Sequence, residues 1–273
     1  MKKKVSSIVL NLVLLVLGVV TVYPFLWMLA SSFKKNSEIV ALHQTFLPKL
    51  FTAGNYVSMN AHFNFMRFFA NSIFITLAIT VIVIYTSTLC GFVLSKYKFK
   101  GRDALFGLVL ATMMIPWCVT IIPRYSMIKA FGWMNSYAAL IVPASFSGFG
   151  IFMMKQHIAS VPNEILEAAR IDGANTGQVI WHVMRPVVSP GLITVGILIG
   201  LQSWNEYLVS STFLQGEKNF TATLGFLSMN GSYGSNMSIL MASSVILIAP
   251  IVVFCLCAQR YLVDGMVSGA VKG

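Results

Sequence analysis

The chain has 273 residues, of which 57% are hydrophobic and only 10% are charged, with a mean hydropathy of +0.79. A soluble domain carries about 25% charged residues, so this composition excludes an ordinary water-soluble protein. The net charge of +11 does not indicate nucleic-acid binding, because the basic residues lie in short segments between apolar stretches.

Six apolar stretches are long enough to cross a hydrocarbon core about 30 Å thick. They cover residues 8–30, 68–94, 104–122, 137–154, 187–210 and 238–258. Each is expected to be an α-helix, because a lipid-facing backbone must satisfy its own hydrogen bonds. The sequence therefore predicts an all-α polytopic membrane protein with six transmembrane helices, in a single transmembrane domain over residues 1–273. Kinks are predicted at Pro24, Pro116, Pro143 and Pro250.

The first stretch has a secretory signal peptide as its alternative, because three lysines precede it. Its length and its bulky end at residues 24–27 favour a membrane span.

The distribution of lysine and arginine predicts the orientation of these spans. With the N-terminus inside, the inner segments hold 12 of the 19 basic residues and the outer loops hold 7. The positive-inside rule then places both termini in the cytoplasm, including a C-terminal tail of residues 259–273. The outer loops 31–67 and 211–237 are long enough to fold locally and to contact an extracytoplasmic partner.

The segment of residues 160–186 is charged and amphipathic, although it lies between two apolar stretches. Ser160 is predicted to cap a first helix, and Gly173 fits a left-handed turn at its end. Pro186 is predicted to end a second short helix. One face of the first helix is predicted to carry Ile165, Ala168, Ala169 and Asp172. In a membrane-embedded chain this hairpin indicates a docking site for a water-soluble partner, and a solvated surface loop is the alternative.

Glu206 is the only carboxylate inside a predicted span, near the outer end of the fifth. A charge at mid-bilayer costs about 2.5–3.5 kcal/mol on insertion scales, so such residues tend to face a wet cavity. The neighbouring Trp204, Asn205 and Tyr207 offer rings and hydrogen-bonding groups that suit a sugar. The sequence therefore predicts a translocation path or gate at residues 204–207, with an interfacial aromatic belt as the alternative.

Smaller features receive structural interpretations. Gly196 and Gly200 have the spacing that lets helices approach closely, either within the chain or against a homologous subunit. No metal site is predicted, because His157 and His182 lack further suitably spaced ligands. The apolar surroundings of the cysteines predict buried thiols at Cys90, Cys118, Cys255 and Cys257.

Glu167, Ala168 and Ala169, followed by Gly173 and Pro186, resemble the EAA signature of ATP-binding-cassette importer permeases. Four longer runs resemble the carbohydrate-uptake branch of this family: SFKKNSEI, FGIFMMKQHIASVPNEILEAARIDGA, SWNEY and QRYLVDGMVSGAVKG. The resemblance covers nearly the whole chain and is closest to the second permease subunit of maltose-type oligosaccharide importers. One departure is Arg185, which stands where the family usually has leucine.

The resemblance implies a non-catalytic permease subunit in the cytoplasmic membrane of a prokaryote, working by alternating access. It would form the translocation path with a homologous permease and receive sugar from an extracytoplasmic binding protein. Two cytoplasmic ATPase subunits would bind ATP and Mg, leaving this chain without a cofactor or metal. The implied ATPase-coupling residues of the hairpin are Glu164, Glu167, Ala168, Ala169, Arg170, Asp172 and Gly173. Independently, the sequence has no G-x-x-x-x-G-K-[ST] phosphate-binding loop.

Two alternatives remain open from the sequence. An importer permease for another solute, such as an amino acid or polyamine, would share the same architecture. A secondary transporter would need coupling-ion carboxylates inside its spans, and only Glu206 qualifies.

Overall fold

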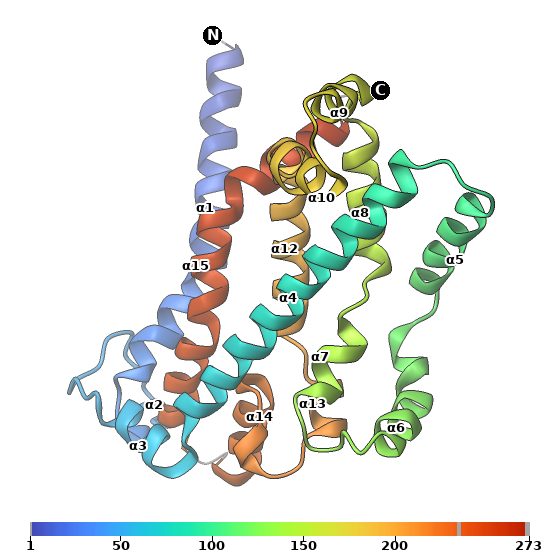
Figure 1. Cartoon of the computed structure of the whole chain (residues 1–273). Helices are drawn as coiled ribbons and strands as arrows, with labels where there is room; N and C mark the ends of the chain where they lie inside the picture. Colours follow the sequence, from blue (N-terminus) through green and yellow to red (C-terminus); the bar gives the residue numbers. More distant parts are fainter. Residues whose placement is uncertain (1, 234–235, 271–273) are drawn as a thin grey trace. The chain divides into compact units, whose positions relative to one another are not determined.

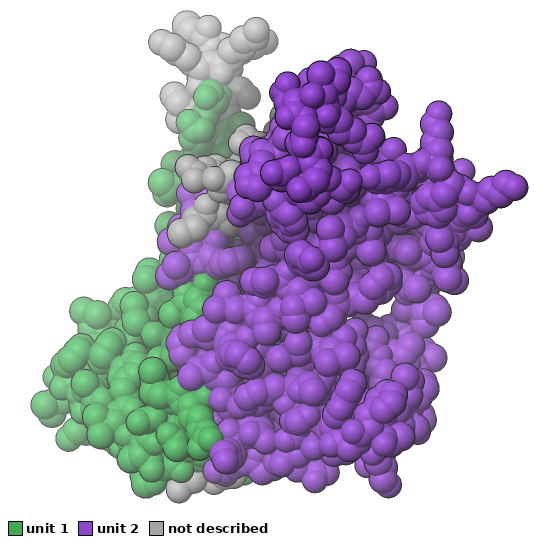
Figure 2. Space-filling model, in the orientation of Figure 1, with its two compact units in different colours: residues 1–67, 225–250 green, residues 68–224, 251–273 purple. Residues whose placement is uncertain are grey.

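The computed structural model describes residues 2–233 and 236–270, and every regular element in these ranges is a helix (Figure 1). The chain divides into two compact units, coloured separately in Figure 2. Unit 1 comprises residues 1–67 and 225–250, and unit 2 comprises residues 68–224 and 251–273. The prediction of an all-α polytopic membrane protein is confirmed for the described part of the chain.

Unit 1 is built from three helices and parts of three others. Its own elements are α1 (Lys2–Ser32), α2 (Asn36–Ile39) and α3 (Gly54–Phe63). It also holds the first residues of α4 (Phe65–Lys96), most of α14 (Ala222–Tyr233) and the start of α15 (Met237–Ala270). The predicted tail from residue 259 continues α15 as far as Ala270, and residues 271–273 lie outside the described residues.

The predicted outer loop at residues 31–67 folds around one buried lysine. Lys34 is only 1% exposed, donates from Nζ to the Thr45 carbonyl, and lies 4.4 Å from the centre of the Trp27 ring. The Asn55 amide donates to the carbonyls of Ser32 and Lys34. Burial lowers the pKa of Lys34 below its ordinary value, although the nearby Glu38 carboxylate opposes this shift. This loop therefore has a folded structure of its own.

Unit 2 holds the central part of the chain. After α4 it contains α5 (Arg102–Met114), η1 (Trp117–Thr120), α6 (Ile121–Ala130), α7 (Ala138–Ala144) and α8 (Gly148–Ala159). It continues with α9 (Asn163–Ile171), α10 (Thr176–Gln178), the π-helix η2 (Val179–Met184), α11 (Arg185–Val187), α12 (Ser189–Trp204), α13 (Leu208–Phe213) and η3 (Glu217–Asn219).

Four of the described helices are long and apolar enough to cross a membrane, and six spans result if each of two bent helix pairs is one span. The first pair bends by 93° between Met114 and Trp117, inside the third predicted span. Pro116 causes this break, because the residue before a proline is held out of the helical region, and Ile115 has an extended backbone. The expected kink is therefore a sharp break.

The fifth predicted span, residues 187–210, is longer than the helix that forms there. The second bent pair turns by 83° before Ser189, and α12 ends at Trp204. Residues 205–207 form a turn, and α13 begins separately at Leu208. The turn coincides with the polar run of Gln202, Ser203, Asn205 and Glu206, which interrupts the apolar stretch.

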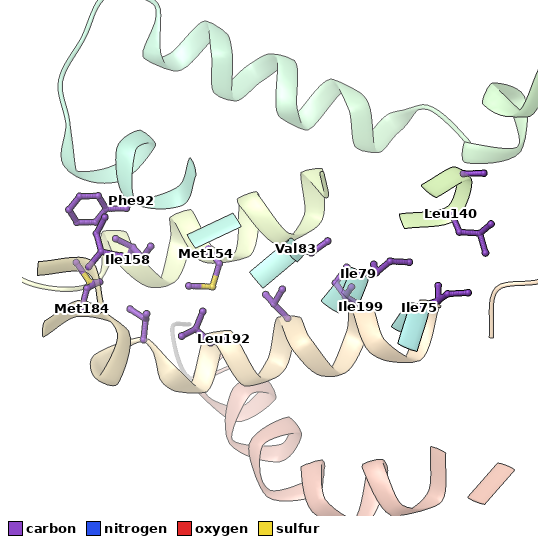
Figure 3. Close-up of a cluster of buried hydrophobic side chains, with 14 of the residues drawn as sticks. Ile75, Ile79, Val83, Phe92, Leu140, Met154, Ile158, Met184, Leu192 and Ile199 are labelled. Atoms are coloured by element: carbon purple, nitrogen blue, oxygen red, sulfur yellow. The ribbon is translucent and has the colours of Figure 1, made fainter. Parts of the chain in front are cut away.

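A continuous apolar core runs along α12 inside unit 2. Figure 3 shows it extending from Phe92, Ile158 and Met184 at one end to Ile75, Leu140 and Ile199 at the other. All of these side chains are buried. The core therefore extends along unit 2 from one end of the unit to the other.

Glycines allow the helices of unit 2 to pack at short range. A Cβ added at Gly150 of α8 would collide with the Ser87 hydroxyl of α4, and one at Gly191 of α12 would lie 2.5 Å from the His157 ring. Gly196 faces Ile84 of α4 at 3.1 Å in the same test. Such close approaches are how membrane helices associate without a hydrophobic drive.

Gly200 lies more loosely, 3.6 Å from Thr80 and from Phe254 of α15 by the same measure. Both predicted packing glycines, Gly196 and Gly200, therefore lie against helices of this chain.

The prediction of buried thiols is wrong for Cys118 and Cys255, because their helices turn these faces outward, while Cys90 is partly buried. The side chain of Cys257 lies outside the described residues.

Candidate functional site

The hairpin of residues 160–186 begins with a helix that starts later than predicted. Ser160 belongs to the end of α8, where its hydroxyl donates to the His157 carbonyl at 2.8 Å. Ser160 does not cap the next helix, whose N-cap position is Pro162 and has no side-chain cap. α9 starts instead at Asn163, directly after Pro162.

The turn of the hairpin is fixed by glycine, as the sequence predicts. Gly173 has a φ of +84°, and its N–H donates to the Arg170 carbonyl at 3.0 Å. The Ala174 N–H donates to the Ala169 carbonyl at 2.9 Å, which completes a Schellman motif. Glycine takes this left-handed conformation without the steric cost that a Cβ imposes.

The second helix begins with a capping box and ends later than predicted. The Asn175 side chain accepts from the Gln178 N–H at 3.0 Å, and the Gln178 side chain accepts from the Asn175 N–H at 2.8 Å. The helix then widens into η2, and Pro186 lies in the first turn of α11. A first turn tolerates proline because no N–H is required there, so the helix ends after Val187.

One face of the hairpin is packed into unit 2. Leu166 of α9 and Val179, Ile180 and Met184 of η2 are all buried in the apolar core. The Trp181 ring stacks on Tyr85 of α4, with ring centres 5.6 Å apart and planes within 11°. These contacts hold the hairpin on α4 and on the apolar core of unit 2.

Two polar anchors join the hairpin to the end of α4. Lys96 Nζ donates to the Val161 carbonyl at 2.6 Å and to Asn163 Oδ1 at 3.0 Å. The Arg170 guanidinium lies 5.9 Å from the Tyr97 ring centre and donates weakly to its hydroxyl at 3.4 Å. Arg170 therefore also contacts its own chain.

The opposite face of α9 is exposed and mixed in character. Glu164, Glu167, Ala168 and Asp172 lie there, together with Ile171, which is 86% exposed. The predicted common face of Ile165, Ala168, Ala169 and Asp172 is divided by the structure. Ala169 is half-buried against the core, whereas Ala168 points outward.

Ile171 is a candidate that sequence reasoning missed. The available signal was its spacing, since it follows Ala168 by three residues and Glu167 by four. An isoleucine so exposed at the end of a charged helix adds apolar surface to the exposed face.

A cavity of about 550 Å³ lies in unit 2 at the end opposite the hairpin, where Figure 1 shows α6 and α13. We call it the α12–α13 pocket. Its polar lining consists of Ser72, Thr76, Trp117, Arg124, Ser147, Gln202, Ser203, Asn205, Glu206, Tyr207, Ser210 and Thr221. Ile75, Ile79, Leu140 and Ile199 line it from the core side. The same core that holds the hairpin therefore forms one wall of the pocket.

Glu206 lies in the turn between α12 and α13, not within a spanning helix. Its carboxylate accepts from the Val209 N–H at 2.6 Å, and from the Ser210 N–H and hydroxyl, each at 2.9 Å. The charge thus faces the N-terminus of α13, where the helix dipole favours an anion. From the sequence, the Glu206 charge was expected to be hydrated in a wet cavity. In the structure, Val209 and Ser210 supply its hydrogen bonds.

The other residues of the predicted path are divided between the pocket and the core. Asn205 and Tyr207 are exposed and line the pocket together with Glu206. The Asn205 amide also donates to the Leu201 carbonyl at 2.9 Å. Trp204 is buried against Phe69, with ring centres 5.5 Å apart, and does not line the pocket.

Nine polar residues of the pocket lining were not predicted as site residues, and Thr76, Trp117, Arg124 and Ser203 are four of these. They come from α4, η1, α6 and α12, so no spacing along the chain brings them together. The described residues contain no group of three or more histidine, cysteine, aspartate or glutamate side chains suited to a metal.

Comparison with known proteins gives a consistent result. The family model for the binding-protein-dependent transport system inner membrane component matches residues 87–265. The arabinooligosaccharides transport system permease protein AraQ of Halalkalibacterium halodurans is 32% identical, with all of both chains covered. The protein of the same name from Bacillus subtilis is 31% identical, over 98% of this chain and 97% of that one.

A solved structure supports the fold. The crystal structure of a bacterial transporter that imports the acidic polysaccharide alginate contains a chain similar to this one. The TM-score is 0.85 at 22% identity, covering 96% of this chain and 98% of that chain.

Proposed function

Because the chain belongs to the family of binding-protein-dependent transport system inner membrane components, we propose that it is the permease subunit of an ATP-driven oligosaccharide importer. The sugar class comes from relatives named for arabinooligosaccharides, of which the match covers 97% or more. The observation that carries the permease role is the hairpin, which has one face packed into unit 2 and a charged face that is exposed.

The proposed partners follow from this role. A homologous permease completes the translocation path, and an extracytoplasmic binding protein delivers the sugar. Two ATPase subunits bind ATP and Mg and dock on the hairpins of the two permeases. The complex lies in the cytoplasmic membrane of a prokaryote with both termini of this chain inside, and the chain itself is non-catalytic and holds no cofactor.

The exposed face of α9 is the proposed joint to the ATPase. Glu164 and Glu167 supply charge, Ala168 permits close approach, and Ile171 supplies apolar area. Gly173 sets the angle of the two short helices, while Ala169 and Arg170 hold α9 on unit 2. Asp172 ends α9 beside this face.

The core along α12 is the proposed transmission element. It runs from Met184 in the hairpin to Ile199 at the pocket, so a movement of one end displaces the other (Figure 3). Switching a pore from 1:99 to 99:1 between two states requires about 5.5 kcal/mol of differential stabilisation. The ATPase and the binding protein supply this energy, and Asn205, Glu206 and Tyr207 lie on the path that opens and closes.

The test is to tag this chain, isolate the assembled complex, and reconstitute it in vesicles with its binding protein. Oligosaccharides are expected to stimulate ATP hydrolysis and to accumulate on the side of the ATPase. Amino acids and polyamines serve as the matched solute panel. Stimulation by one of these, and by no sugar, would contradict the sugar assignment, while uptake that follows an ion gradient without ATP would contradict the whole proposal.

A further inference from the structure

We propose that residues 40–51, in the outer loop between α2 and α3, are a membrane anchor that binds the outer lipid leaflet at the boundary between headgroups and acyl chains. The sequence predicted that this loop contacts an extracytoplasmic partner. The inference goes beyond the proposed transport function, and it does not depend on which solute is transported.

The segment of residues 40–51 presents a nearly uncharged surface. Lys49 is its only charged residue. Leu42 is fully exposed, and it belongs to a set of exposed large apolar side chains. This set consists of Val40, Leu42, Phe46, Leu47, Leu50 and Phe51. A concentration of exposed apolar side chains marks a contact with a partner or with lipid.

The exposed side chains belong to a folded segment. The Lys49 N–H donates to the Glu38 carboxylate at 3.0 Å, and the Thr52 N–H donates to the Phe33 carbonyl at 3.0 Å. One face of the Phe51 ring stacks on Phe33, with ring centres 4.5 Å apart. The outward direction of the apolar side chains is therefore a property of the folded loop.

Ring contacts place the segment beside a membrane-spanning helix (Figure 1). The Phe46 ring centre lies 5.8 Å from that of Tyr23 and 5.9 Å from that of Trp27. Both partners belong to the part of α1, residues 9–32, that is long and apolar enough to cross a membrane. Trp27 precedes the end of α1 at Ser32 by five residues, or about 8 Å of helix. The segment therefore returns along α1 to a level within the predicted span.

The composition at this level is that of a lipid interface. Tyr23 and Trp27 also contact each other, with ring centres 6.2 Å apart. Tryptophan and tyrosine are enriched where headgroups meet acyl chains, so the cluster with Phe46 indicates that depth. Lys49 is exposed beside the apolar side chains. A lysine at such a position extends its stem along apolar surface and its ammonium group toward lipid phosphates.

The buried lysine of this loop supports a lipid environment. The Lys34 ammonium group lies over the Trp27 ring, donates to the Thr45 carbonyl, and belongs to a residue that is only 1% exposed. In water, enclosing an ammonium group in this way is costly, because hydration is lost. Beside acyl chains, the alternative to enclosure is contact with lipid. The segment therefore shields the Lys34 charge from the lipid that its own apolar side chains contact.

The test measures the accessibility of spin labels in the assembled complex, reconstituted in phospholipid vesicles without the binding protein. Leu42→Cys and Leu47→Cys are labelled in a background without the four native cysteines. Both side chains are exposed, so labels at these positions should not disturb the fold. Oxygen, which concentrates in lipid, should relax both labels strongly, whereas a water-soluble nickel chelate should relax them weakly.

The matched control is Glu217→Cys, at an exposed position of the outer loop in η3, where the nickel chelate should relax the label strongly. The ratio of oxygen to nickel accessibility should be severalfold higher at positions 42 and 47 than at position 217. Strong relaxation by nickel at 42 and 47 would place the segment in water and refute the anchor. Weak relaxation by both agents would show that a protein, such as the homologous permease, covers the segment. That result, or loss of assembly in either variant, would also refute the anchor.

Discussion

The hairpin and the α12–α13 pocket are both polar regions of unit 2, and they present their polar groups in opposite ways. In the hairpin, charged side chains follow one another along α9 and point outward from a packed base. In the pocket, hydroxyl, amide and guanidinium groups from several elements converge on an internal space. The first arrangement suits a large protein partner, and the second suits a small ligand.

Their carboxylates show the same contrast. Glu167 is exposed on the outer face of α9. Glu206 is half-buried and bonded to Val209 and Ser210. An exposed charge can be matched by a partner, whereas a charge already satisfied at a helix terminus mainly stabilises its own turn. The two glutamates are therefore expected to respond differently to substitution.

Gly173→Val should have the largest effect, abolishing transport while the chain remains in the membrane. Its φ of +84° is unfavourable for a β-branched residue, at a cost of at least about 1 kcal/mol. The hairpin angle should change and ATPase docking should fail. Co-purification of the ATPase measures this. Gly132→Val, at a φ of +70° with equally open surroundings, is the control and should dock normally.

Glu167→Lys should weaken ATPase docking by about 2–5 kcal/mol, the range for losing one member of an interfacial charge pair. The isolated subunit should keep its stability, because the side chain is exposed. Sugar-stimulated ATP hydrolysis in vesicles is the measurement. Glu217→Lys, an equally exposed glutamate in η3, provides the control. Equal docking of both variants with the wild type would show that α9 is not the joint.

Glu206→Leu should lower the uptake rate severalfold without affecting docking, because α13 loses a cap worth about 0.5–2 kcal/mol. Glu206→Gln sharpens the comparison, since glutamine keeps one acceptor for the N–H groups of α13. If capping is the role of Glu206, the glutamine variant should retain most of the uptake. Uptake as low as that of the leucine variant would show that the path requires the negative charge itself.

Ile171→Ser should weaken ATPase docking by about 1–2 kcal/mol through the loss of buried apolar area. The thermal stability of the subunit alone should not change, because this side chain is 86% exposed. Titration of the reconstituted permease with purified ATPase measures the affinity. A fall in the stability of the isolated subunit would mean that Ile171 packs within the chain.

Thiol labelling tests the orientation of the two regions with little effect on activity. Thr176→Cys in α10 and Glu217→Cys in η3 place exposed positions at the hairpin and in the outer loop. In a background without the four native cysteines, an impermeant reagent added to intact cells should label position 217 and not position 176. The reverse pattern would invert the proposed topology.

The sequence by itself determined the features that depend on neighbouring residues. Apolar length located the membrane helices, because a lipid-exposed backbone has no other way to satisfy its hydrogen bonds. Gly173 was correctly placed in the left-handed turn, since the requirement for glycine is a local steric one. The charged composition of residues 160–186 also identified the hairpin. This signal is local, because the residues of its exposed face are close to one another in the sequence.

Only the tertiary structure decided which groups meet across the fold. It showed that Ala168 is exposed whereas Ala169 packs against the core, because the buried face of α9 depends on the position of the core. It ended α12 at Trp204 and showed that the Glu206 carboxylate accepts hydrogen bonds from the first turn of α13, which depends on how the chain turns after α12. It also brought Thr76 and Ser203 to one cavity from helices more than a hundred residues apart in sequence. Such contacts depend on helix packing through close approaches, which no local pattern of residues encodes.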